Sequence, residues 1–302
     1  MFKKFAPFFV ITAAVLWGID GIVLRPTLFT LPVTLVVFIE SAIVALILSP
    51  FFIKKLNEIK ILSKKDLLAF IGVALFGGAI GTMAITKALF YVNFVNLSIV
   101  ILIQKLQPVF AILFASILLK EKLTTRFLLW AVTAILGAFI LTFGFNLPII
   151  NSEDKTALAA FFAILASVSF ALSTVLSKRA LRNVTFETGT YLRFLTTSII
   201  MLVFVLVNSS YSEFSSISHT QIIIFLIIAF TTGGPAIFLY YYGLKEVSAS
   251  HSTIYELAFP LSAVILEYFI HDNILNLEQW FGAIILMVSI LKVTTFDEKS
   301  SS

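Results

Sequence analysis

The stretch "NFVNLSIVILIQKLQPVFAIL" (residues 93–113) has a counterpart later in the chain, "KEVSASHSTIYELAFPLSAVI" (residues 245–265). The alignment pairs Pro108 with Pro260 and Gln104 with Glu256. Two other segments, "AAVLWGIDGIVLR" and "ASVSFALSTVLSK", align at nearly the same shift, which is about 150 residues. Self-similarity at one long period indicates that the chain consists of two copies of a single unit.

The composition is that of an integral membrane protein. Of the 302 residues 60% are apolar and only 12% are charged, and the mean hydropathy is +1.06. A helix needs about 20 apolar residues to cross a bilayer. Segments of this kind predict an all-α protein with ten transmembrane helices, near residues 6–25, 33–53, 67–90, 96–119, 126–145, 157–178, 187–207, 221–243, 249–270 and 277–293.

The two copies are predicted to be inverted with respect to each other. They cover residues 1–146 and 151–297, and each holds five of the expected helices. Because five is an odd number, the second copy enters the membrane in the opposite sense. Inverted repeats are typical of alternating-access transporters, whose substrate site lies near the midplane between the halves.

The distribution of basic residues predicts the orientation. If the amino terminus is cytoplasmic, sixteen Lys and Arg residues fall on the inner side and only Arg25 and Lys155 on the outer side. Positive loops stay in the cytoplasm, so both termini are expected there, in a bacterial inner membrane. This placement also accounts for the net charge of +5 without a nucleic-acid partner.

The segment "KALFYVNFVNLSIVILIQKLQPVFAILFASILLKEKLT" (87–124) resembles the drug/metabolite transporter superfamily, specifically its ten-helix EamA type. The resemblance rests on an Ala-Leu-aromatic turn, a central Pro and a Glu followed by Leu and a hydroxyl residue: Ala88, Leu89, Pro108, Glu121, Leu123 and Thr124. The second half offers Tyr240, Tyr241, Gly243, Pro260, Asn273, Leu275 and Asn276, so that the usual Glu is missing from the second copy. Arg193-Phe194 fits a further family feature of the second helix, whereas the first copy has Glu40-Ser41.

The resemblance implies a secondary transporter of small polar metabolites. Members of the family export or exchange amino acids and other metabolites, so amino acid-like zwitterions or cations are the first expectation. The alternatives are an anionic nucleotide-like or lipid-linked metabolite, and a membrane receptor or assembly partner that transports nothing. The expected partners are a small substrate, membrane lipids and a coupling proton, in a monomer or homodimer.

Charged residues inside predicted spans identify candidate site residues, because a charge at this depth must face protein, a partner or water. Lys105 and Glu256 are each roughly 12–14 Å into their spans and therefore near the midplane. We expect Lys105, Glu256, Gln104 and the aromatic residues Tyr255 and Trp17 to bind the substrate. The alternative is a buried Lys105–Glu256 ion pair that only fixes helix packing.

Three further charges lie nearer the ends of their spans and are candidates for gating or ion coupling. Glu40 and Arg193 occupy equivalent positions of the two copies with opposite charge. Asp20 lies close to the outer end, where Arg25 is a possible partner. Each of the three has a structural alternative, as a local cap or ion pair.

Pro108 and Pro260 are candidate hinges, because each removes a helix hydrogen bond at the matched midpoint of a span. The sequence predicts that this protein is not an enzyme and has no cofactor or metal. It contains no Gly-rich phosphate loop, HExxH or nucleophile elbow. Its three histidines, His219, His251 and His271, are predicted in separate places and not in a metal-binding cluster.

Overall fold

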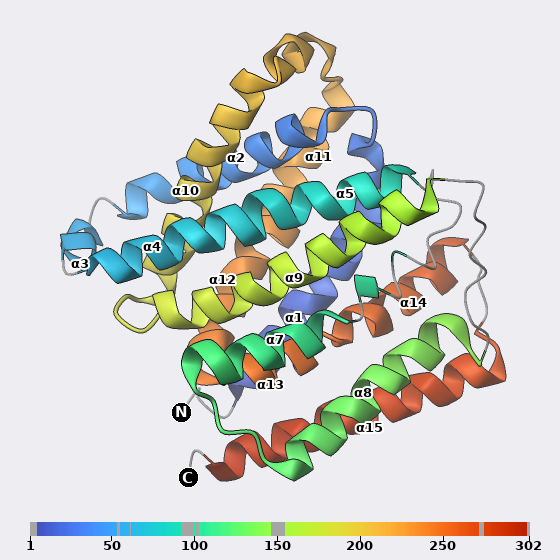
Figure 1. Cartoon of the computed structure of the whole chain (residues 1–302). Coiled ribbons are helices and arrows are strands. Elements are labelled where there is room, and N and C mark those ends of the chain that lie inside the picture. Colours follow the sequence, from blue (N-terminus) through green and yellow to red (C-terminus); the bar gives the residue numbers. More distant parts are fainter. Residues whose placement is uncertain are drawn as a thin grey trace.

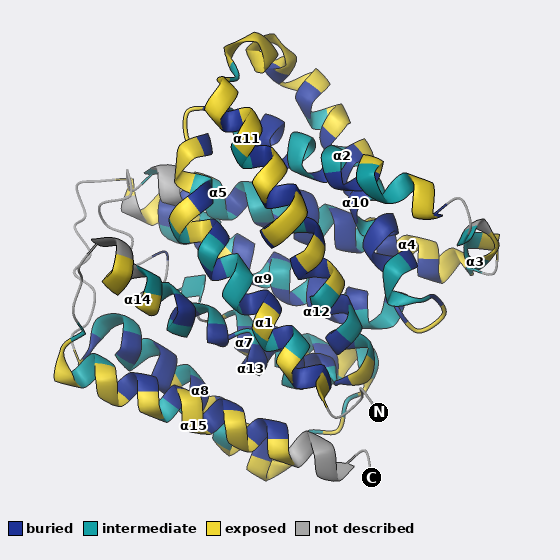
Figure 2. Ribbon diagram, turned by 180° about the vertical axis from the view of Figure 1, so that it is seen from behind, coloured by how far each residue is buried: buried dark blue, intermediate teal, exposed yellow. Residues whose placement is uncertain are grey.

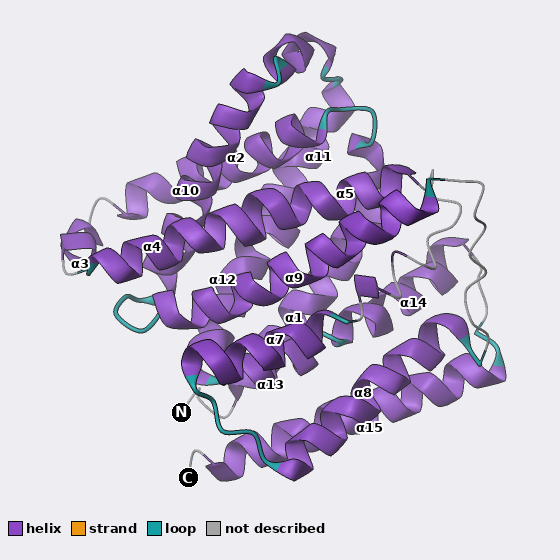
Figure 3. Ribbon diagram, in the orientation of Figure 1, coloured by secondary structure: helices purple, strands orange, loops and turns teal. Residues whose placement is uncertain are grey.

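All described parts of the chain are helices, turns and short connections (Figure 3). The computed structural model describes residues 5–52, 55–60, 62–91, 100, 103–104, 106–145, 155–271 and 275–300. Within these ranges there is no strand, which confirms the prediction of an all-α fold.

Eight helical stretches among the described residues are long and apolar enough to cross a membrane. Two of them contain a π-helical segment between two α-helices, and the first ends with a π-helical and a 3-10 segment. The stretches are Ala6–Leu28, Val33–Phe52, Lys64–Ala88, Thr125–Phe143, Ala157–Ala180, Phe186–Val207, His219–Glu246 and Leu277–Thr295. The π-helical segments are Asp20–Leu24, Ala74–Ile80, Ala115–Leu119 and Ala229–Gly233.

The fourth and ninth predicted spans are not among the eight. The fourth falls partly outside the described residues, and its described part comprises α7 (Gln107–Phe114) and the π-helical segment that follows it. The ninth is divided into α13 (Ala249–Tyr255) and α14 (Ala258–His271). The described residues therefore give eight long spans and one divided one, and the count of ten helices stays a prediction because the fourth lies partly outside them.

The long helices pack in reciprocal pairs, and the first helix of each half lies against the third helical stretch of the other half (Figure 1). The second helices of the halves pack together, and so do the fifth. The pairs are α1 (Ala6–Ile19) with α12 (Gly234–Glu246), α9 (Thr156–Ala180) with α4 (Lys64–Val73) and α5 (Gly81–Tyr91), α2 (Val33–Phe52) with α10 (Phe186–Val207), and α8 (Thr125–Phe143) with α15 (Leu277–Ser300). Short elements complete the bundle: 3-10 turns Arg25–Leu28 and Ser210–Ser216, α3 (Leu56–Lys60) and α11 (His219–Ile228).

Helices α8 and α15 approach closely through two glycines. A Cβ atom on Gly137 would lie 2.7 Å from the Leu286 backbone nitrogen, and one on Gly282 would collide with the Leu141 backbone nitrogen. Small residues let transmembrane helices pack backbone to backbone. The two glycines therefore explain why these helices run side by side in Figures 1 and 2.

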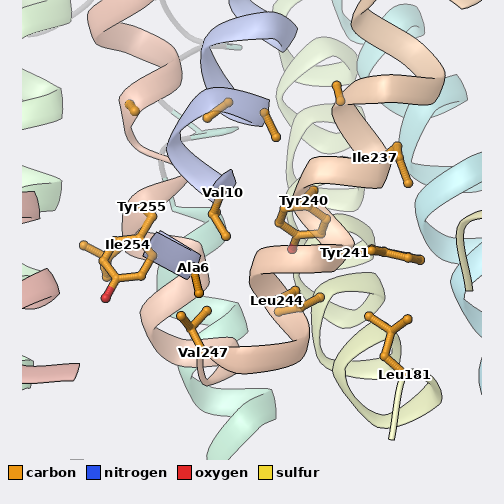
Figure 4. Close-up of a cluster of buried hydrophobic side chains, with 14 of the residues drawn as sticks. Ala6, Val10, Leu181, Ile237, Tyr240, Tyr241, Leu244, Val247, Ile254 and Tyr255 are labelled. Atoms are coloured by element: carbon orange, nitrogen blue, oxygen red, sulfur yellow. The ribbon is translucent and has the colours of Figure 1, made fainter. Parts of the chain in front are cut away.

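The core joins the two halves of the chain. Ala6 and Val10 of α1 lie among Leu244 of α12 and Ile254 and Tyr255 of α13, all within one buried cluster (Figure 4). Exposed residues follow the outer faces of the helices (Figure 2), and they include large apolar side chains such as Leu129 and Ile284. Apolar residues on an outer face are expected where a helix meets lipid rather than water.

The two ends of the bundle are distinct. Both labelled termini lie at the same side, together with α3 and the connection between α9 and α10 (Figure 1); we call this the terminal end. The 3-10 turn Arg25–Leu28, which closes the first span, lies away from it, and we call that side the far end.

Candidate substrate site

Glu256 lies at the break in the ninth span, as the residue that caps the carboxyl end of α13. Its carboxylate accepts hydrogen bonds from the Tyr240 hydroxyl (2.8 Å), the Gln107 side-chain amide (3.0 Å) and the Ser252 hydroxyl (3.4 Å). Gln107 is the first residue of α7, so both interrupted spans meet at this point. At the break between α13 and α14, two polar side chains meet inside the bundle, Gln107 from the first half and Glu256 from the second.

Aromatic and hydroxyl groups extend this cluster. The Trp17 ring of α1 lies 5.2 Å from the Tyr240 ring, centroid to centroid. The Tyr240 hydroxyl also lies 3.0 Å from the Thr174 hydroxyl of α9. We call the six residues Trp17, Gln107, Thr174, Tyr240, Ser252 and Glu256 the central cluster.

A second polar group is built around Arg193 on α10. Its guanidinium donates to the Tyr241 hydroxyl at 3.3 Å and lies 5.7 Å from the centre of the Tyr241 ring. The Ser177 hydroxyl is 2.9 Å from the same tyrosine oxygen. Tyr241 follows Tyr240 directly on α12, and Figure 4 shows the two rings on different sides of that helix, so Arg193 and Glu256 are linked through neighbouring tyrosines.

Two of the three candidate gating residues, Asp20 and Glu40, meet at Arg25. Arg25 pairs with Asp20 at 2.7 Å and with Glu40 at 3.4 Å, and Asp20 accepts a hydrogen bond from Thr232 at 3.3 Å. The π-helical segment Asp20–Leu24 explains the first pair, because its wider turn brings residues five apart onto nearly the same face. We call Asp20, Arg25, Glu40 and Thr232 the Arg25 cluster.

The predicted substrate-binding residues are only partly brought together. Trp17 and Glu256 belong to the central cluster, whereas Lys105 lies outside the described residues, so its predicted pairing with Glu256 stays a prediction. The first-half residue that donates a hydrogen bond to Glu256 is Gln107, three residues after Gln104, and substrate binding by Gln104 stays a prediction. Tyr255 is fully buried beside His251, with their rings 6.5 Å apart.

Both candidate hinge prolines follow an interruption rather than kinking a continuous helix. Pro108 occupies the first turn of α7, and Pro260 is the third residue of α14. The first-turn N–H groups of a helix have no partner within that helix, so a proline there costs no hydrogen bond. The prediction of a kink in an unbroken span differs from the structure for this reason.

Glu121, which the family resemblance singled out, orients α13. Its carboxylate accepts hydrogen bonds from the backbone of Ala249 (2.8 Å) and Ser250 (3.1 Å), and from the Ser250 hydroxyl (2.6 Å). A carboxylate satisfies the free N–H groups at a helix start and interacts favourably with the helix dipole. Glu121 therefore fixes the helix that presents Ser252 and Glu256 to the central cluster.

The described residues contain no group of three or more His, Asp or Glu side chains arranged to hold a metal ion. The chemistry available to the central cluster is that of hydrogen bonding and aromatic contact. Polar groups and aromatic rings that converge in this way are typical of sites for small polar molecules.

A sequence model of the EamA-like transporter family matches the chain twice, at residues 4–143 and 157–295. The chain belongs to the EamA-like transporter family. This confirms the resemblance to the drug/metabolite transporter superfamily, and the family is one of multi-pass membrane transporters, in agreement with the apolar helices.

Relatives of this EamA-like chain include characterised and uncharacterised transporters. It is 46% identical over 283 residues to the riboflavin transporter ImpX of Fusobacterium nucleatum, covering 93% of this chain and 95% of that protein. It is also 24% identical over 244 residues to an uncharacterised transporter of Synechocystis, covering 78% of this chain and 68% of the other. Transport of a small molecule is therefore the function of this EamA-like protein.

A crystal structure of another protein superposes on this EamA-like chain with a TM-score of 0.76 at 15% sequence identity. The match covers 97% of this chain and 98% of the other. At this identity the likeness concerns the fold alone.

Proposed function

We propose that this protein transports riboflavin across a bacterial cytoplasmic membrane by alternating access. The observation that carries the proposal is the 46% identity to the riboflavin transporter ImpX over nearly the full length of both chains.

The central cluster supports a flavin as ligand. Riboflavin has a planar aromatic tricycle, one edge with hydrogen-bond donors and acceptors, and a polyhydroxyl tail. Trp17 and Tyr240 offer aromatic surface for the planar ring system. The amide of Gln107, the carboxylate of Glu256 and the hydroxyls of Thr174 and Ser252 offer donors and acceptors within the same cluster.

The expected amino acid-like substrate finds no support in the relatives, and the chemistry of the central cluster favours an uncharged ligand. The contacts of Glu256 described above come from uncharged groups. A free ammonium and carboxylate would need separate charged receptors at this depth. We therefore place a neutral flavin before a zwitterion or an anionic nucleotide-like metabolite.

Alternating access requires closures at both ends that open in turn, and contacts between the halves exist at each end. At the far end Thr232 of the second half donates to Asp20 of the first half. At the terminal end Glu58 accepts hydrogen bonds from Thr185, and Lys55 lies 3.4 Å from Glu187. We propose that residues 1–146 and 151–297 are inverted repeats whose relative rocking breaks these contacts alternately.

The orientation proposed for the membrane has the terminal end in the cytoplasm. This end carries the labelled termini (Figure 1) and most of the Lys and Arg residues of the loops. Positive loops remain cytoplasmic. The protein is proposed to work as a monomer or homodimer surrounded by lipid.

Counterflow into proteoliposomes tests the proposed substrate. The purified protein is reconstituted with unlabelled riboflavin inside, and the entry of radiolabelled riboflavin is followed. Excess external riboflavin should abolish this entry, whereas flavin mononucleotide, glutamine and lysine should leave it unchanged. Counterflow driven by an amino acid or by flavin mononucleotide, but not by riboflavin, would refute the proposal.

A further inference from the structure

Glu256 differs from Asp20 and Glu40 in that its hydrogen bonds come from uncharged groups, and it differs from Asp66 in lying at the break of a span rather than at a helix start. Asp20 and Glu40 both face the Arg25 guanidinium, and Asp66 caps the start of α4 with the Ser63 backbone and hydroxyl. The hydrogen bonds of Glu256 come from an amide, a phenol and an alcohol. The ion pairs found among the described residues do not include it.

These neutral partners suit either protonation state of the carboxyl group. A hydroxyl is both donor and acceptor, and either oxygen of the Tyr240–Thr174 pair, 3.0 Å apart, can be the donor. When Glu256 is ionised, Tyr240 donates to it. When Glu256 is protonated, it can donate to Tyr240, which then donates to Thr174, so the chain of hydrogen bonds reverses without leaving a buried group unpaired.

Glu256 lies where this series of hydrogen bonds meets the two halves of the protein that are proposed to move against each other. It lies between α13 and α14, and its contacts come from α7 of the first half and α12 of the second. A rocking motion of one half against the other changes this junction directly. A metal cation is a poor alternative occupant, because three donors already point at the two carboxylate oxygens.

We propose that Glu256 is a proton-binding residue that couples flavin movement to the proton gradient, with one proton and one flavin crossing in the same direction. This inference rests on the proposed riboflavin transport. A neutral flavin supplies no charge to offset a carboxylate, and a bare carboxylate is costly in a site closed off from water. The loaded site therefore closes with Glu256 protonated, and the proton leaves to water on the other side.

Other ionisable groups surround this carboxyl group and enter the interpretation of any pH dependence. They lie on α10, on α12 and on α13 itself, and they are Arg193, Tyr240, Tyr241, His251 and Tyr255. A pH dependence that disappears when Glu256 is substituted is due to Glu256 and not to these other groups.

The first test measures proton and flavin movement together in proteoliposomes that contain a pH-sensitive dye, with the membrane potential clamped. A gradient of one pH unit should drive riboflavin toward the alkaline side to about tenfold accumulation, with about one proton per flavin. Glu256→Gln should show no accumulation, and any remaining flux should carry no protons. Glu213→Gln, a change in an exposed acid of the Ser210–Ser216 turn, should behave as the parent protein.

The second test needs no substrate. In a background of Trp130→Phe and Trp280→Phe, Trp17 is the single tryptophan and reports on the Tyr240–Glu256 chain. Its fluorescence should titrate with pH in this background, and the transition should disappear when Glu256→Gln is added. A titration that persists in that variant would overturn the inference.

The outcomes separate the two proposals. Riboflavin counterflow without accumulation under a pH gradient would refute proton coupling and leave riboflavin transport intact. Absence of riboflavin counterflow would refute the proposed substrate, and the Trp17 titration alone would then decide whether Glu256 binds a proton.

Discussion

The Gln107 side-chain amide donates to the Glu256 carboxylate across 3.0 Å, although 149 positions separate the two residues in the chain. The contact joins the first half to the second where both interrupted spans begin a new helix, α7 and α14. It is the most direct polar link between the halves within the central cluster.

Replacing Gln107 with Leu should weaken riboflavin transport. The substitution removes one donor from a buried carboxylate, which costs about 1–3 kcal/mol. We expect a rise of about tenfold in the KM for riboflavin, measured in proteoliposomes. Gln104→Leu compares the residue predicted from the sequence with the residue that contacts Glu256, and it should change KM less than twofold; equal effects of both changes would contradict the assignment.

Replacing Trp17 with Ala should reduce flavin binding and its spectroscopic signature. Contact between aromatic rings contributes about 0.5–1.5 kcal/mol beyond the buried area. Riboflavin fluorescence should be quenched on binding to the parent protein, and this quenching should be largely lost in the variant. Trp280→Ala, at a residue that is 56% exposed on α15, should leave the quenching unchanged.

Replacing Arg25 with Gln should destabilise the protein, because Asp20 and Glu40 would then face each other without a cation. Breaking a buried ion pair costs about 3–5 kcal/mol, and the 30% exposure of the Arg25 side chain reduces that figure. The melting temperature in detergent should fall. The added change Glu40→Gln should restore much of the loss; a double variant no more stable than the single one would argue against repulsion between the acids.

Replacing Gly137 with Leu should disrupt the packing of α8 against α15. The new side chain would collide with the Leu286 backbone, and overpacking of this kind costs about 1–3 kcal/mol or more. A lower melting temperature should follow. Val132→Leu adds volume on the same helix at a residue that is 55% exposed, and it should have no measurable effect.

The Glu58–Thr185 contact should weaken in acid. Partial burial favours a higher pKa for the Glu58 carboxyl, but hydrogen bonds from the Thr185 backbone and the Thr188 and Thr185 hydroxyls outweigh it, so the pKa is lowered. The stabilisation is therefore present above the unfolded pKa of about 4.3 and is lost as the pH falls through the lower folded value. Hydrogen exchange at the start of α10 should accelerate over this acid range, and Glu58→Gln should remove the dependence.

Much of the architecture follows from the linear sequence. Hydropathy predicts membrane spans because each helix must satisfy its own backbone hydrogen bonds in lipid. The alignment of Pro108 with Pro260 predicted that the corresponding spans each lose a helix hydrogen bond near the midpoint. The structure places a helix start close to each proline. The break before each proline was not predicted, because a proline is compatible with a kink as well as with a new helix.

The choice between Gln104 and Gln107 shows where the sequence stops being informative. Three residues apart on a helix, the two side chains share one face, so spacing alone does not tell which of them reaches Glu256. The alignment of the two halves of the chain favoured Gln104 as a site residue because it is the counterpart of Glu256. In the structure Gln107, as the first residue of α7, makes the contact.

The sequence by itself determined that the protein is a helical membrane protein, and it predicted that its two parts repeat and which charged residues lie deep in it. These properties depend on the order and spacing of residues along one chain. Only the tertiary structure decided which polar groups meet: Glu256 with Gln107 and Tyr240, Arg193 with Tyr241, and Asp20 and Glu40 with Arg25. Apart from the local Asp20–Arg25 pair, these contacts depend on how separate helices pack and where they break, and hydropathy and spacing do not encode either.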